Sequence, residues 1–150
     1  MTANQPAEYL AFFKHRCEHC QILLALSEQQ QAAISENQLD ELLSIIGRKQ
    51  RVLTLMEDTK REQPALWENW QTDREGLDSE TRQRCEQYLA ETESLLASLV
   101  QLEQQGTDQL KKNRDHTQAE LQQISRSMKA NDAYYDQGES PTHRFLDVGR

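Results

Sequence analysis

The chain has 150 residues, of which 36% are hydrophobic, and its formal net charge is −8. This acidic balance argues against a nucleic-acid-binding protein, because phosphate binding requires a basic face. Only five glycines and three prolines accompany abundant Gln, Glu and Leu, a composition that favours long helices in a narrow bundle.

The first predicted helix begins near Pro6, a favoured first-turn residue, and ends near Gln31. Its apolar residues fall in a sector about 120° wide when successive side chains are placed about 100° apart. Arg16 and Ser27 interrupt this sector, whose members are Tyr9, Phe12, Phe13, Cys20, Leu23 and Leu24. Residues 32–38 are predicted to form a short connection.

A second predicted helix is capped by Ser35, because Ser35 followed by Gln38 resembles a capping box. It ends near Arg61, and Gly47 should weaken it by under ~1 kcal/mol relative to alanine. One apolar seam follows the i, i+3, i+4, i+7 spacing, with Lys49 on the same seam. The apolar members are Leu39, Leu42, Leu43, Ile46, Leu53 and Met56.

The connection between Pro64 and Gly76 contains both tryptophans. Trp67 and Trp70 are three residues apart, which predicts a short helical turn that closes one end of the core. Asp78 or Ser79 is then predicted to cap the third main helix.

From Ser79 to Ala130 there is no proline and one glycine, which predicts a rod of ~78 Å at ~1.5 Å per residue. Leucines at heptad spacing indicate coiled-coil-like packing near its start and loose packing beyond Leu110. The first two helices are too short to cover it. We therefore predict an all-α antiparallel bundle of three main helices with an overhanging C-terminal helix. Residues 1–136 should form this single domain, and residues 137–150 a flexible tail.

The segment HRCEHC, residues 15–20, contains two histidines and two cysteines, which are zinc-ligand types. On one helix these four side chains point in different directions and cannot converge on one ion. We expect Cys17 and Cys20 to be buried core residues; a small metal-binding regulator that uses them is the alternative. The chain contains no phosphate-binding loop, nucleophile elbow or zinc-protease motif. We expect no enzyme, no bound metal and no cofactor.

The end of the long helix carries an apolar face formed by Leu121, Ile124 and Met128 at i, i+3 and i+7. We call these residues, with Leu110, the C-terminal apolar face. An exposed apolar face with a methionine suits the capture of an amphipathic partner helix. The alternatives are a folded-back tail and a structural coiled-coil protein whose apolar end forms a homodimer.

The chain also shows no signs of export or membrane insertion. No basic region followed by an apolar core stands at the start, and no apolar run approaches the ~20 residues that span a bilayer. Three cysteines, an odd number, fit a reducing compartment. We expect a cytoplasmic protein.

Two stretches resemble the FlgN/FliT-type flagellar export chaperones: LDELLSIIGRKQRVLTLME at 39–57 and SMKANDAYYD at 127–136. The resemblance implies a cytoplasmic type III secretion chaperone. Such a chaperone binds the helical C-terminal region of hook-associated proteins, prevents their premature assembly and passes them to the export gate. It also implies that the C-terminal apolar face contributes the substrate groove, and that Tyr134 or Tyr135 docks on the export-gate protein.

Overall fold

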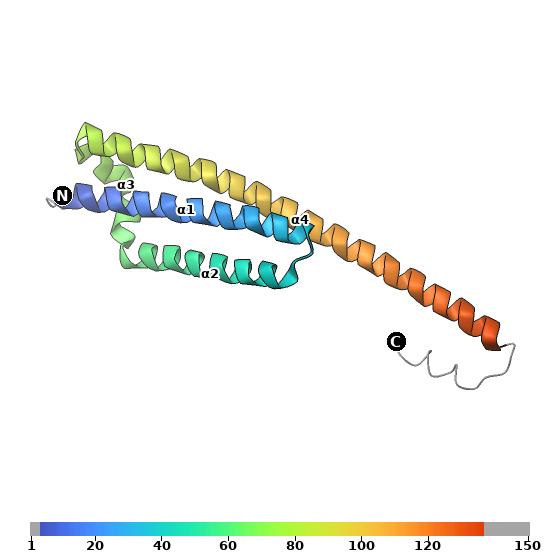
Figure 1. Cartoon of the computed structure of the whole chain (residues 1–150). Coiled ribbons are helices and arrows are strands. Elements are labelled where there is room, and N and C mark those ends of the chain that lie inside the picture. Colours follow the sequence, from blue (N-terminus) through green and yellow to red (C-terminus); the bar gives the residue numbers. More distant parts are fainter. Residues whose placement is uncertain (1–3, 137–150) are drawn as a thin grey trace. The chain divides into compact units, whose positions relative to one another are not determined.

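The computed structural model describes residues 4–136, and these are helical almost throughout, with no strand among them. In chain order the elements are α1 (Gln5–Ser35), α2 (Leu39–Glu62), α3 (Pro64–Asp73), the short 3-10 helix η1 (Arg74–Gly76) and α4 (Ser79–Asp136) (Figure 1). The predicted all-α helical class is confirmed. The chain divides into two compact units, Met1–Thr107 and Asp108–Arg150, and α4 contributes to both. We describe each unit by itself, and the predicted tail lies outside the described residues.

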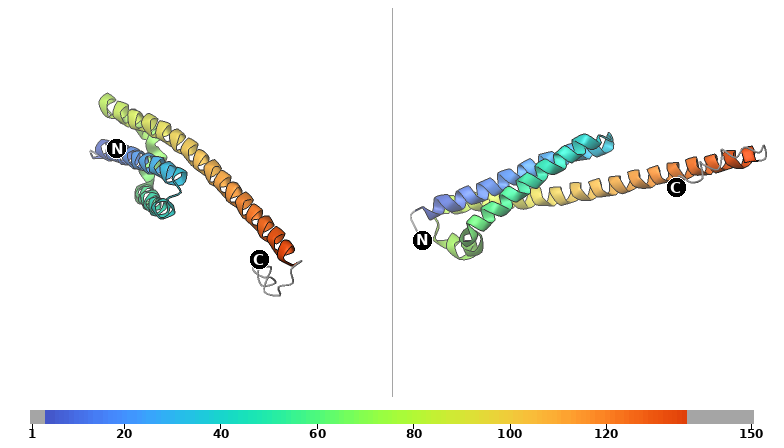
Figure 2. Two further views of the ribbon diagram at one scale, coloured as in Figure 1. Left: turned by 45° about the vertical axis from the view of Figure 1, so that its right-hand side comes forward. Right: turned by 90° about the horizontal axis from the view of Figure 1, so that it is seen from below.

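Within the first unit, α1, α2 and the start of α4 lie side by side in an up-down-up order (Figures 1 and 2). Two hydrogen bonds establish that α1 and α4 run in the same direction. Gln21 Nε2 donates to Glu91 Oε1 at 3.0 Å, and farther along both helices Ser27 Oγ donates to Glu103 Oε1 at 3.0 Å. The short α3 and η1 connect the end of α2 to the start of α4.

The turn between α1 and α2 differs from its prediction. Helix α1 continues to Ser35, so Ser35 ends one helix and does not cap the next. Asn37 has a φ of 55°, its N–H donates to Ile34 O, and the N–H of Gln38 donates to Ala33 O. This is a Schellman C-cap with asparagine in the left-handed position. Burial of Ala33 and Ile34 explains the extra turn, because ending the helix at Gln31 would expose both.

One end of the first unit is closed by an aromatic cluster, as predicted for the tryptophan pair. Trp70 packs edge-on against Phe13 at a centroid distance of 4.8 Å and lies 5.4 Å from Tyr9. Tyr9 Oη donates to Asp73 Oδ2 at 2.7 Å, and burial, then the Asp73 carboxylate, raise the pKa of Tyr9 to about 12. Trp67 lies at the edge of the cluster and is partly exposed. The complete buried set is Tyr9, Phe12, Phe13, Leu66, Trp70, Leu77 and Cys85.

A second apolar cluster lies near the α1–α2 turn and shows that the seam prediction for α2 was largely wrong. Leu42 and Ile45 are the buried residues of α2, packed with Leu26, Ala33 and Ile34 of α1. Four predicted seam residues are exposed instead: Leu39, Leu43, Ile46 and Leu53. The physical reason is that α2 packs mainly along α1, and contact with one helix buries a narrower stripe than the sequence carries.

Helix α4 begins at the predicted cap and continues through its glycine. The backbone N–H of Thr81 donates to Asp78 Oδ2 at 3.1 Å, which identifies Asp78 as the capping residue. At Gly106 the helix approaches α1 closely, since an added Cβ would lie 3.4 Å from Gln31 Oε1 and 3.5 Å from Ile34 Cδ1. Across residues 4–136, no helix combines the length and apolarity needed to cross a membrane.

Candidate functional site

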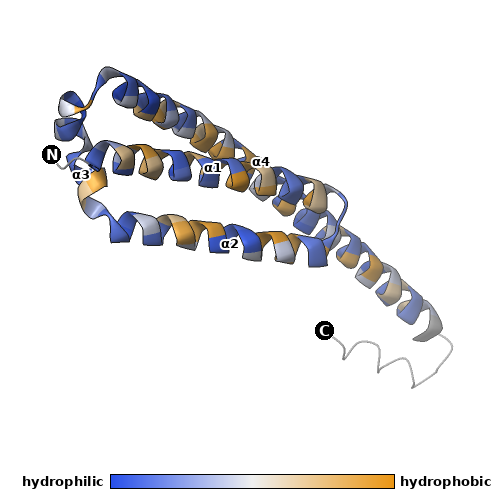
Figure 3. Ribbon diagram, turned by 60° about the vertical axis from the view of Figure 1, so that its left-hand side comes forward, coloured by the Kyte–Doolittle hydropathy of each residue, from blue (hydrophilic) through white to orange (hydrophobic). Residues whose placement is uncertain are grey.

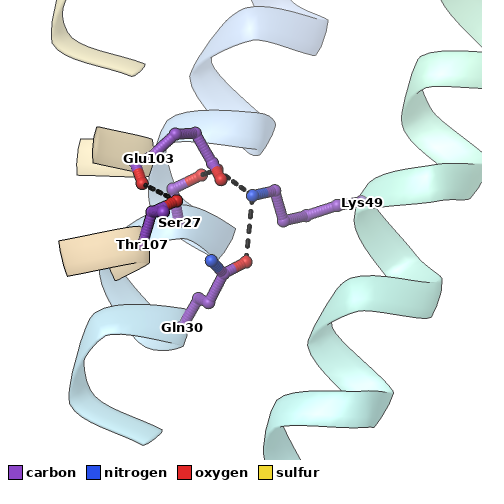
Figure 4. Close-up of polar contacts among 5 residues, drawn as sticks. All are labelled: Ser27, Gln30, Lys49, Glu103 and Thr107. Atoms are coloured by element: carbon purple, nitrogen blue, oxygen red, sulfur yellow. Dashed lines mark hydrogen bonds and ion pairs between the residues drawn. The ribbon is translucent and has the colours of Figure 1, made fainter. Parts of the chain in front are cut away.

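The three long helices of the first unit are joined by one polar cluster (Figure 4). Lys49 of α2 donates to Glu103 of α4 and, at 2.9 Å, to Gln30 Oε1 of α1. Ser27 of α1 donates to the same Glu103 oxygen. The sequence placed Lys49 on an apolar seam; in the structure its ammonium ties α2 to both neighbouring helices.

The charges in this cluster compensate one another. Burial by itself would raise the pKa of Glu103, but the hydrogen bonds from Lys49 and Ser27 outweigh it, and the pKa lies below its ordinary value. Glu103 is therefore an ionised partner of Lys49 at neutral pH. A carboxylate held in this way is a poor general base, since such a base needs a pKa near the working pH.

Beside the cluster lies an apolar groove of about 500 Å³, entirely within the first unit. Its walls are leucine and valine side chains of all three long helices, and Lys49 and Glu103 also line it. The apolar lining residues are Leu23 of α1, Leu53 of α2, and Leu96, Leu99 and Val100 of α4. Val100 is strongly exposed, so the groove is open to solvent.

The two cysteines of the HRCEHC segment are buried, as predicted. Cys17, Cys20 and also Cys85 are almost fully covered. Burial raises the pKa of all three thiols, that of Cys85 to about 11, so they remain protonated and weakly nucleophilic. His15 is exposed and His19 half-buried. No cluster of three or more metal-ligand side chains occurs among the residues that the structure describes.

The C-terminal apolar face lies on α4 in the second unit and is exposed. The exposed fractions are 44% for Leu110, 61% for Leu121, 55% for Ile124 and 44% for Met128. Contacts within this helix join residues one turn apart, such as Gln109 Nε2 to Asn113 Oδ1 at 2.9 Å and His116 to Glu120 at 2.9 Å. All four side chains therefore present apolar surface to solvent.

The two candidate docking tyrosines stand at the end of the described helix. Tyr134 is 73% exposed. Tyr135 belongs to α4, and its side chain lies outside the described part of the chain.

Sequence reasoning missed the exposed apolar side of α2. Leu39, Leu43 and Ile46 lie there, and Figure 3 shows hydrophobic and hydrophilic residues alternating along α2. The signal was present in the sequence, because residues 39–56 contain more apolar positions than one helix contact can bury. Together with the groove, this side gives the first unit apolar surface suited to binding another helix.

Comparison with known proteins gives one finding. The family model described as FlgN protein matches residues 1–142. No curated protein and no solved structure matches the chain.

Proposed function

The chain belongs to the FlgN family of flagellar export chaperones, which are not enzymes, and on that premise we propose that its cargo is the hook-associated proteins. It binds their helical C-terminal regions in the cytoplasm, prevents their premature assembly and delivers them to the type III export gate. The C-terminal apolar face of α4 contacts the cargo, and Tyr134 or Tyr135 docks on the export-gate protein.

The observation that carries this proposal is the exposure of the C-terminal apolar face. Leu121, Ile124 and Met128 lie at i, i+3 and i+7, so they share one side of the helix, and each is at least 44% exposed. An amphipathic cargo helix that packs on this side would cover them and would lose its own exposed apolar stripe in the same step.

The test uses the purified full chain and a purified C-terminal segment of a hook-associated protein. Titration calorimetry should detect a complex, and Leu121→Asp combined with Ile124→Asp should weaken it at least about tenfold, because two charges would be desolvated. The matched control is Ala119→Asp with Gln122→Asp, which adds the same charges at the same spacing to exposed positions on another side of the same helix. The control should bind within about twofold of the unchanged chain.

Three results would contradict the proposal. The first is the absence of any complex with the unchanged chain. The second is equal binding by the Leu121/Ile124 variant and its control. The third is a permanent dimer, measured by light scattering over a concentration series, that only the Leu121/Ile124 variant abolishes; this would assign the face to a structural coiled coil.

A further inference from the structure

A hollow of about 350 Å³ lies between α1 and α2 in the first unit, and the function proposed above does not use it. Its apolar wall is formed by Phe12, Leu53 and Met56. Arg16 and Lys60 line the same hollow and give it a cationic side, and the His19 ring lines it as well. We call it the Arg16 hollow.

Arg16 and Lys60, the two cations of the Arg16 hollow, form no ion pair within residues 4–136. The Arg16 guanidinium carbon lies 4.2 Å from the centroid of the Trp67 ring, and Lys60 Nζ lies 4.9 Å from the same centroid. Neither side chain forms an ion pair with any residue in the described range, and Arg16 Nε is buried without a hydrogen-bond acceptor. The carboxylate of Glu57 also lines the hollow, but it pairs with neither cation. Two like charges that line one hollow repel each other, and an anion bound in that hollow would offset the repulsion.

We propose that the Arg16 hollow binds an acidic amphipathic helical segment of the cargo, a proposal that rests on the proposed function. A cargo carboxylate pairs with Arg16 and Lys60, and an apolar cargo side chain one helical turn away packs on Phe12, Leu53 and Met56. Residues one turn apart share a helix face, so one short helix presents both groups. The planar guanidinium can hold a carboxylate through two parallel hydrogen bonds, and this geometry selects an acidic group over a merely polar one.

An acidic cargo helix fits this hollow better than a second copy of the chain does. Each copy has a net charge of −8, so the approach of two copies is opposed over their whole surfaces. A cargo segment brings one local carboxylate to the cations. The hollow shares Leu53 with the larger apolar groove, so the cargo helix could continue along apolar surface.

The experiment titrates the full chain with the same purified hook-associated C-terminal segment at about 0.05 M and about 0.3 M salt. Arg16→Gln and Lys60→Gln should each weaken binding about tenfold at low salt, and both should reduce the salt dependence of the dissociation constant. Lys60 is exposed, so Lys60→Gln tests the charge even if Arg16→Gln alters folding. Lys14→Gln is the matched control, since it removes one exposed positive charge of α1 outside the hollow, and binding should change less than about twofold.

A second pair of variants tests the apolar wall. Leu53 and Leu55 are both leucines of α2, exposed by 43% and 54%, and only Leu53 lines the Arg16 hollow. Leu53→Gln should weaken binding at least about fivefold, whereas Leu55→Gln should leave it within about twofold.

The outcomes separate this inference from the proposed function. A complex that is lost with Leu121→Asp and Ile124→Asp, but unaffected by Arg16→Gln, Lys60→Gln and Leu53→Gln, would overturn the inference alone. No complex with the unchanged chain would overturn both. Self-association that Leu53→Gln abolishes while cargo binding persists would assign the hollow to a second copy and would also overturn the inference.

Discussion

The ion pair of Lys49 and Glu103 should stabilise the first unit, and removing Glu103 should destabilise it more than removing Lys49. The Lys49 side chain is 13% exposed and that of Glu103 is 46% exposed. Glu103→Gln leaves the covered ammonium without its counter-charge. We expect this variant to lower the free energy of unfolding by about 1–2 kcal/mol, a range that allows for solvent screening of the half-exposed carboxylate.

Replacing Lys49 should lower the free energy of unfolding by less than replacing Glu103 does. Lys49→Met keeps an apolar stem of similar length and leaves Glu103 half in water, so its charge remains solvated. We expect a loss below about 0.5 kcal/mol, and we expect the double variant to be about as stable as Lys49→Met alone. Glu93→Gln, on an exposed position of the same helix, is the control and should change stability by under about 0.5 kcal/mol.

Urea unfolding followed by tryptophan fluorescence measures these differences, because Trp67 and Trp70 both lie in the first unit. The pKa of Glu103 is lower in the folded chain than its ordinary value of 4.5. Its contribution is therefore complete at neutral pH and is lost as pH falls below 4.5 and through the lowered pKa. The gap between the unchanged chain and Glu103→Gln should shrink on acidification. A Lys49→Met variant that loses as much as Glu103→Gln, or a gap that is constant with pH, would refute the reasoning.

Two further predictions concern the glycines and the thiols. Gly47→Ala should raise the free energy of unfolding by about 0.5–1 kcal/mol, because nothing lies within 4 Å of an added Cβ. Gly106→Leu should lower the free energy of unfolding, because even an added Cβ lies 3.4 Å from Gln31 Oε1. Urea unfolding measures both changes, and a stabilising Gly106→Leu would show that α1 and α4 do not approach each other there. The thiols of Cys17, Cys20 and Cys85 should resist an aromatic disulfide reagent at pH 8 in the folded chain, because they are buried and their pKa values are raised. In urea, where the chain is unfolded, all three should react. Absorbance counts the labelled thiols, and rapid labelling of the folded chain would contradict their burial.

The sequence predicted best those features that depend on local residue chemistry. Asp78 caps α4 because its carboxylate reaches the N–H of Thr81, and the apolar spacing of α1 placed Tyr9 and Phe13 in the core. The sequence-based prediction was wrong where two local signals competed. Ser35 satisfied a capping motif, but with Ile34 buried and Asn37 in the left-handed conformation, α1 continues as far as Ser35 and ends there.

The prediction of a buried apolar seam on α2 was wrong for a different reason. Hydrophobic periodicity shows how much apolar surface a helix has, but it does not show how many neighbouring helices cover that surface. Leu42 is buried and Leu43 is exposed, although both fit the spacing rule. The Arg16 hollow could not be predicted from the sequence either. Arg16 read as a break in the sector of α1, and only the fold brings Lys60 and Trp67 to it.

If cargo binds the C-terminal apolar face as proposed, the free energy available from covering that face is too small to hold the cargo without further contacts. Complete burial of one large apolar side chain is worth about 1.5–3 kcal/mol. The four side chains of this face are only about half exposed, with fractions of 44% for Leu110, 61% for Leu121, 55% for Ile124 and 44% for Met128, so covering all four yields about 3–6 kcal/mol. A dissociation constant of about 1 μM needs about 8 kcal/mol, and ordering a cargo helix opposes binding further.

Additional contact surface, or a second weak site linked through the same cargo chain, is needed to close this gap. The first unit offers such a surface in the Arg16 hollow and the adjoining groove, where apolar area is combined with two cations that form no ion pair within residues 4–136. Two weak sites also suit release, because a cargo segment that leaves one site loses most of the combined affinity at once. Two weak sites therefore suit a chaperone that must release its cargo better than one strong site does.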